Sequence, residues 1–121
     1  MGLSEQWDAL DNGSQFITAS LIVRTQFAQE NPEAVAAFLE EYSASTQFIN
    51  ENVAEGAQLV GEYGIVDAAV AEKALPYCNI VCITGEEMIQ GLSGFFKVLH
   101  GSNPKSVGGK LPDENIFYSE K

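Results

Sequence analysis

The spacing of hydrophobic residues changes along the chain, and residues 15–23 have the two-residue period of a β-strand. One face of this strand would be wholly apolar, formed by Ile17, Ala19, Leu21 and Val23. The opposite face would carry the hydroxyls of Thr18 and Ser20 between apolar neighbours. We therefore expect a strand that is buried on one side and partly polar on the other.

A helical period follows. Asn31 is a favoured N-cap residue, and Pro32 suits the first position of a helix. Apolar or semi-polar side chains then recur three or four residues apart, at Val35, Phe38, Leu39, Tyr42, Thr46 and Ile49. This stripe predicts a helix of about five turns with one buried face.

Two shorter helices are expected next. Asn52 and Glu55 have the spacing of a capping box, and Gly64 can end the helix that they begin. Asp67 can cap an alanine-rich helix, which Pro76 would stop.

Residues 79–83 read as a second short strand. Thr84 and Glu87 then form another predicted capping box, and Gly101 can end the helix that follows. Its apolar face would consist of Met88, Leu92, Phe95, Phe96 and Leu99. His100 lies near its carboxyl end, where a cation is favoured.

The flanking segments are predicted to be less regular. Residues 1–14 form a polar lead-in in which Trp7 is a packing residue, and residues 102–121 read as a loop or tail. Two short strands among four or five helices are too few for an ordinary sheet. Either they pair in a small helical domain, or the chain is part of a larger α/β protein.

Composition narrows the function. The 121 residues include 6 Lys+Arg and 17 Asp+Glu, a formal charge of −11, which argues against binding nucleic acid or an anionic membrane surface. Hydrophobic residues make up 45% of the chain, too many for a disordered acidic tail. We see no signal peptide, and no apolar stretch approaches the roughly 18 residues of a membrane span.

No catalytic or metal-binding arrangement emerges from the remaining motifs, and no cofactor is expected. Cys78 and Cys82 are four residues apart, which in a strand is too far for a disulfide, and no third ligand completes a zinc site. His100 is explained by its place at a helix end. The hydroxyls of Thr18 and Ser20 stay of interest, because they are either satisfied within the core or directed into a cleft.

Several segments resemble one family. TASLIVRTQFAQENPEAV (18–35), ALPYCNIVCITGEEM (74–88) and LSGFFKVLHGSNPKSVGGKLPDENIFY (92–118) are similar to the solute-binding proteins of ABC importers. The branch is the one that handles nitrate, sulfonates, taurine and thiamine-pyrimidine-like solutes. The resemblance runs from about residue 15 to residue 118, and is most specific in the first segment and in NPKSVGGKLPD (103–113).

The resemblance implies an α/β fold: a helix-rich C-terminal fragment (15–121) of a two-lobe type II periplasmic binding protein. Residues 15–23 would then be a hinge crossing, and the absent signal peptide would belong to a missing front end. Ligand contacts are carried over only to Thr18 and Ser20, and to Gln15 beside them.

The implied function is capture of a small anionic or aromatic solute in the periplasm, or at the membrane-anchored cell surface, for delivery to an ABC permease. The fragment could also form a homodimer through exposed sheet edges. Two alternatives stay open: a stand-alone helical interaction domain, and a fragment of an enzyme similar to the thiamine-pyrimidine synthases, although the family's His and Cys chemistry has little counterpart here.

Overall fold

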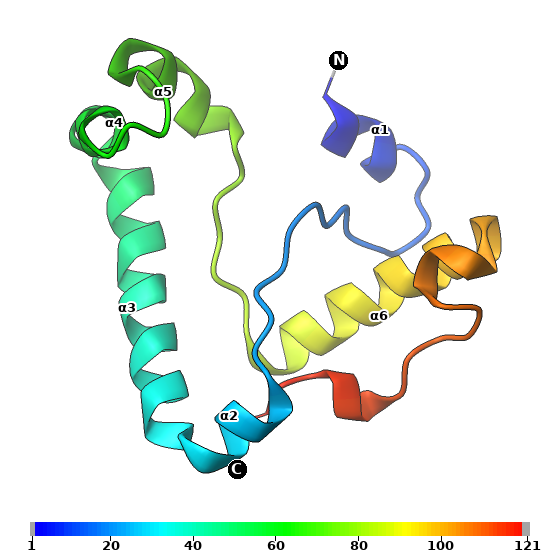
Figure 1. Cartoon of the computed structure of the whole chain (residues 1–121). Coiled ribbons are helices and arrows are strands. Elements are labelled where there is room, and N and C mark those ends of the chain that lie inside the picture. The colour runs from blue at the N-terminus through cyan, green and yellow to red at the C-terminus, as the bar shows by residue number, and fades with distance from the viewer. Residues whose placement is uncertain (1, 120–121) are drawn as a thin grey trace. The chain divides into compact units, whose positions relative to one another are not determined.

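A computed structural model describes residues 2–119 and shows two compact units. Unit 1 comprises the chain up to Ile22 and from Ile83 onward, and unit 2 comprises Val23–Cys82. The helices are α1 (Leu3–Asp8), α2 (Thr25–Glu30), α3 (Pro32–Glu51), α4 (Val53–Glu62), α5 (Ala68–Ala74) and α6 (Gly85–Ser102) (Figure 1). Shorter 3-10 turns are η1 (Leu75–Tyr77), η2 (Pro104–Val107) and η3 (Glu114–Ile116).

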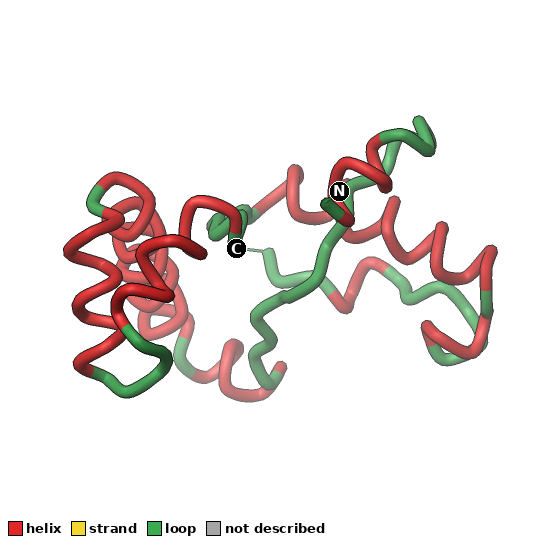
Figure 2. Tube along the Cα trace, turned by 90° about the horizontal axis from the view of Figure 1, so that it is seen from above, coloured by secondary structure: helices red, strands yellow, loops and turns green. Residues whose placement is uncertain are grey.

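Both predicted strands are wrong for this chain, because residues 2–119 contain no strand (Figure 2). Residues 14–24 and 79–84 instead run as irregular connections, which we call the first crossing and the second crossing. A two-residue apolar period favours an extended backbone, but a strand also needs a neighbour to complete its hydrogen-bond ladder. The described chain is thus helical, and the larger α/β fold stays a prediction.

In unit 2, helices α3, α4 and α5 enclose a small core. Its buried members are Ala57, Ala71 and Leu75, and Ile49, Val53, Val60 and Ile80 pack against them. The stripe predicted along α3 is largely confirmed, since Val35 and Thr46 are buried and Ile49 reaches the core. Phe38 departs from it: its side chain is 54% exposed and stacks on Tyr42 with ring centroids 5.8 Å apart.

Two glycines set the spacing of these helices. A Cβ atom at Gly56 would lie 2.9 Å from Cγ1 of Ile49 on α3, and one at Gly61 would lie 3.0 Å from the Cβ of Ala68 on α5. Both distances are shorter than ordinary van der Waals contact. Helix α4 can therefore approach both neighbours only because these two positions carry no side chain.

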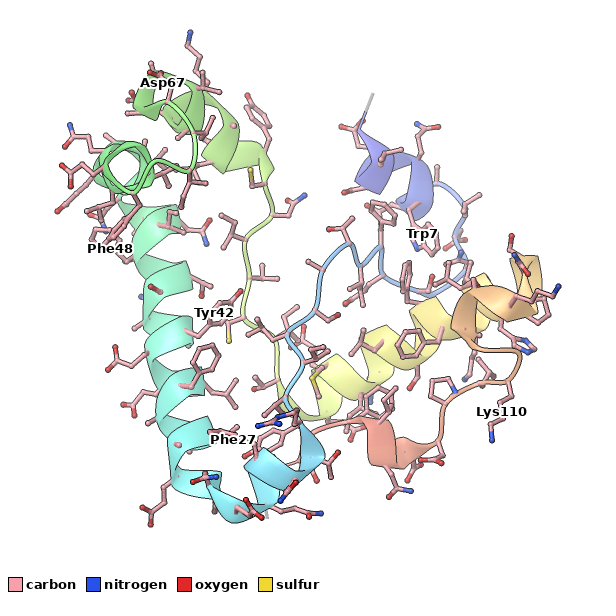
Figure 3. All side chains as sticks on the ribbon, in the orientation of Figure 1. Trp7, Phe27, Tyr42, Phe48, Asp67 and Lys110 are labelled. Carbon is pink, nitrogen blue, oxygen red and sulfur yellow. The ribbon has the colours of Figure 1, made fainter. Side chains whose placement is uncertain are left out.

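The predicted helix caps fare differently from one another. Asp67 caps α5 as expected: its Oδ1 accepts hydrogen bonds from the backbone N–H groups of Ala69 (2.9 Å) and Val70 (3.3 Å) (Figure 3). The capping box at Asn52 does not form, because Asn52 follows α3 directly and its Nδ2 donates to the carbonyl of Phe48, 3.1 Å away.

The start of α6 also differs from the prediction. Thr84 stands at the N-cap position, but its side chain makes no capping hydrogen bond. Helix α2 was not predicted at all. Its last turn is closed from outside by Asn31, whose Nδ2 donates to the carbonyl of Phe27 at 3.2 Å. Asn31 was predicted to cap the start of α3, but its side chain instead caps the end of α2, the helix before it.

Unit 1 is organised around Trp7, which packs as predicted. Its ring lies 5.4 Å from Phe16 and 5.4 Å from Phe95, and its Nε1 donates to the hydroxyl of Ser14 at 2.9 Å (Figure 3). These contacts join α1, the beginning of the first crossing and α6. Gly91 is buried on the face of α6 that this segment approaches.

Candidate functional site

The three predicted ligand residues lie on the first crossing, and all three are exposed. Gln15 rests on α6, since its Oε1 is 2.8 Å from the position that a Cβ atom at Gly91 would occupy. Thr18 and Ser20 lie farther along, where their side chains form no hydrogen bond with another of the described residues. The interpretation in which these hydroxyls are satisfied within a core is therefore wrong.

The first crossing carries apolar side chains that its own unit leaves uncovered. Leu21 is 56% exposed and Ile22 is 97% exposed. The segment from residue 15 to residue 23 contains no charged residue, in a chain with a formal charge of −11. Leu21 and Ile22 are neighbours in the chain, so the apolar surface that they expose is continuous.

The second crossing is anchored more firmly to its unit. Nδ2 of Asn50 lies 2.7 Å from the carbonyl of Thr46 and 2.8 Å from the carbonyl of Ile80, so it ties the crossing to α3. Sequence reasoning missed Asn50. The only signal was a polar residue directly after the predicted apolar stripe, a position that usually faces solvent.

The boundary between the two units falls within both crossings. It lies between Ile22 and Val23 on the first crossing, and between Cys82 and Ile83 on the second. The chain therefore leaves unit 1 once, forms unit 2 without interruption, and returns once. Thr18 and Ser20 precede the first boundary by a few residues.

Each unit has an open hollow among its described residues. The one in unit 2 has a volume of about 450 Å³ and is lined by Gln58, Gly61, Glu62, Asp67 and Ala68. The one in unit 1 has a volume of about 250 Å³ and is lined by Glu86, Ile89, Glu114, Phe117 and Ser119. Neither includes a predicted ligand residue, and the two carboxylates in each disfavour an anion.

The cysteines and the histidine do not form part of a reactive or metal-binding group among the described residues. Cys78 and Cys82 are free thiols, and Sγ of Cys78 donates to the carbonyl of Ala74 at 3.3 Å. Residues 2–119 contain no group of three His, Cys, Asp or Glu side chains placed to hold a metal ion. His100 lies in the last turn of α6, as predicted.

Among the described helices, none has both the length and the apolar character needed to cross a membrane. No protein-family model, curated protein or solved structure matches this chain.

Proposed function

We propose that this chain is the C-terminal part of the solute-binding component of an ABC importer. In that role the whole protein captures a small anionic or aromatic solute between two lobes and presents it to a membrane permease. The observation that supports the proposal is the organisation of the chain: two compact units are joined by two irregular crossings, and the hydroxyls of Thr18 and Ser20 are exposed on one of them.

Two crossings suit a protein that closes around a ligand. Hinge motion needs a few loop residues that can change φ and ψ while the units on either side stay rigid. Between residues 15 and 23 the backbone forms no hydrogen bond with another described residue, so its torsion angles can change without breaking any. Units 1 and 2, by contrast, each have their own packing, around Trp7 and around Leu75 respectively.

The acidic composition is compatible with an anionic solute. Hydroxyl groups such as those of Thr18 and Ser20 donate hydrogen bonds without carrying charge, and backbone N–H groups do the same. The acid-lined hollows are left out of the proposed site, because carboxylates repel an anion. In this proposal the complete protein works in the periplasm or anchored at the cell surface, with the permease as its partner.

The proposal is tested with the natural gene product that carries this chain, by measuring its melting temperature with nitrate, sulfate, taurine, alkanesulfonates and pyrimidines. A ligand at 100 times its Kd stabilises the folded protein by about 2.7 kcal/mol, which is a measurable shift. We expect at least one of these solutes to raise the melting temperature. If none does, and calorimetry also detects no binding, the proposal fails.

Variants then locate the site. Thr18→Val and Ser20→Ala each remove a hydroxyl with little change of volume. Each should weaken the binding of the solute by about 1 kcal/mol, the usual net contribution of a hydrogen bond. Ser45→Ala is the matched control, because Ser45 is an exposed hydroxyl on α3 and belongs to neither crossing. If all three variants bind the solute as tightly as the original protein, these hydroxyls do not contact it.

A stand-alone interaction domain is the second candidate, and one observation favours it. The α4–α5 hairpin exposes a group of apolar side chains: Leu59, Tyr63, Ile65, Val66 and Val70. Tyr63 is 81% exposed although it follows a well-packed helix. If Tyr63→Ser and Ile65→Ser abolish association with a co-purifying protein and no solute binds, this second function is preferred.

A further inference from the structure

The uncovered part of the first crossing has the properties of an unpaired strand. Its amide and carbonyl groups from residue 15 to residue 23 form no backbone hydrogen bond with another described residue, and Thr18, Ala19 and Ser20 are exposed. Leu21 and Ile22, the next two residues, expose more than half of their surface. The stretch is rich in residues that favour strands and contains neither charge nor proline.

Natural proteins usually protect such an edge with charges, proline or a covering element. Between residues 15 and 23 the first crossing has neither charge nor proline, and the helices of unit 1 cover only its beginning, at Gln15, Phe16 and Ile17. The second crossing is less available, because the carbonyl of Ile80 already accepts a hydrogen bond from Asn50 at 2.8 Å. The first crossing is therefore the better place for a strand to be added.

The sequence of the first crossing is complementary to itself. In an antiparallel pair of two copies with Ser20 opposite Ser20, Ala19 faces Leu21, Thr18 faces Ile22 and Ile17 faces Val23. Residues that face each other then lie on the same side of the sheet. One face of the pair is built from Ile17, Ala19, Leu21 and Val23 of both copies, and is wholly apolar.

We propose that two copies of this chain associate through residues 17–23 as antiparallel strands related by a twofold axis at Ser20. A twofold contact of this kind uses the same surface on both copies and closes on itself. The charge of −11 on each copy does not prevent it, because the segment is uncharged and charges more than about 8 Å away are largely screened at physiological ionic strength. The proposal uses the same segment as the proposed solute-binding function, but it requires no solute, so measurements on the chain without solute test it separately.

The first experiment measures the mass of the purified chain by sedimentation over about 1 µM to 1 mM, the range in which weak dimers form. We expect a monomer–dimer equilibrium, with slower hydrogen exchange at residues 18–22 in the dimer than in the dilute monomer. A monomer across the whole range overturns the proposal. Equal protection of residues 18–22 in monomer and dimer also overturns it, because the strand partner would then lie within one chain.

The second experiment uses charge at the twofold axis. Ser20→Lys and Ser20→Glu each place two like charges directly opposite one another, so each variant alone should dimerise at least about tenfold more weakly than the original chain. A mixture of the two variants should restore association, because Lys then faces Glu. Circular dichroism checks that the helices are retained.

Ser45→Lys and Ser45→Glu are the matched controls, since they change the net charge equally at an exposed position on α3. Both should dimerise like the original chain, alone or mixed. If the Ser45 pair behaves like the Ser20 pair, association depends on net charge and the proposed register is wrong. If neither Ser20 variant is weakened, the contact lies elsewhere and the proposal is overturned.

Discussion

Apolar residues occupy about half of the positions both in residues 32–74, which include α3–α5, and in the first crossing, yet only the helical segment buries any of them fully. In the core, Ala57 and Leu75 are nearly inaccessible, whereas Ile22 on the crossing is 97% exposed. The difference lies in what surrounds each segment. Helices satisfy their own backbone and need only side-chain packing, but an extended segment must find both its hydrogen bonds and its cover elsewhere.

Anchoring separates the two regions further. Glycines let α4 approach its neighbours, and Asp67 closes the start of α5. The first crossing is held by its beginning alone, where Phe16 packs near Trp7 with ring centroids 5.4 Å apart. Hydrophobic content thus distinguishes these regions poorly, while close approach and hydrogen bonding distinguish them well.

The largest expected effect comes from the core. Leu75→Ala removes a side chain that is 9% exposed, and should lower the free energy of unfolding by about 2–5 kcal/mol. Leu21→Ala on the first crossing should change it by about 0.5 kcal/mol or less, the usual limit for surface positions. Urea denaturation of both variants checks the comparison, and equal losses would show that the crossing is packed in solution.

A smaller effect is expected where helices touch. Gly56→Ala places a methyl group 2.9 Å from Cγ1 of Ile49, and should destabilise the protein by about 1–3 kcal/mol through overpacking. Gly101→Ala on α6 meets nothing within 4 Å, and should stabilise by about 0.5–1 kcal/mol because alanine favours the helix. If Gly56→Ala lowers the melting temperature and Gly101→Ala raises it, the close contact at Gly56 is supported. A change in the same direction for both variants contradicts it.

The cap of α5 should contribute less again. Asp67→Ala removes the oxygen that accepts from two backbone N–H groups, at a cost of about 1 kcal/mol. Asp67→Asn keeps a side-chain oxygen at this position and should retain most of the stability. The cap would lose its assigned role if both variants unfolded at the same denaturant concentration.

The smallest effect is local. Asn50→Ala removes the hydrogen bonds to Thr46 and Ile80, and should speed hydrogen exchange in the second crossing while leaving residues 18–22 unchanged. Asn52→Ala is the control, since its amide contacts only the end of α3. Faster exchange in both crossings of the Asn50 variant would mean that the two segments open together.

The sequence predicted the helices that have strong local signals. It did not predict features that depend on contacts between residues far apart in the chain. The α3 stripe, the Asp67 cap and the packing of Trp7 were predictable, because period and residue chemistry point to them directly. Helix α2 was missed because it has only 6 residues, fewer than two turns, and lacks an apolar stripe. The cap at Asn52 was misassigned because two helices meet there and its amide serves the earlier one.

The assignment of Thr18, Ser20 and Gln15 to a ligand site stays a prediction. Thr18 and Ser20 were identified as unusual hydroxyls on an apolar segment, and the structure places both in solvent. It does not bring either one, or Gln15, into the two described hollows. Asn50 could not be found from the sequence, because its acceptor on Ile80 is 30 residues away.

The sequence by itself determined the longer helices, the uncharged stretch at residues 15–23 and the strongly acidic character of the chain. The helices follow from interactions between residues within a turn or two of one another, and the acidic character follows from composition. Only the tertiary structure decided that the two apolar segments remain unpaired crossings, and that Gly56 and Gly61 are contact points between helices. Pairing and close packing depend on groups far apart in the chain, so no local pattern specifies them.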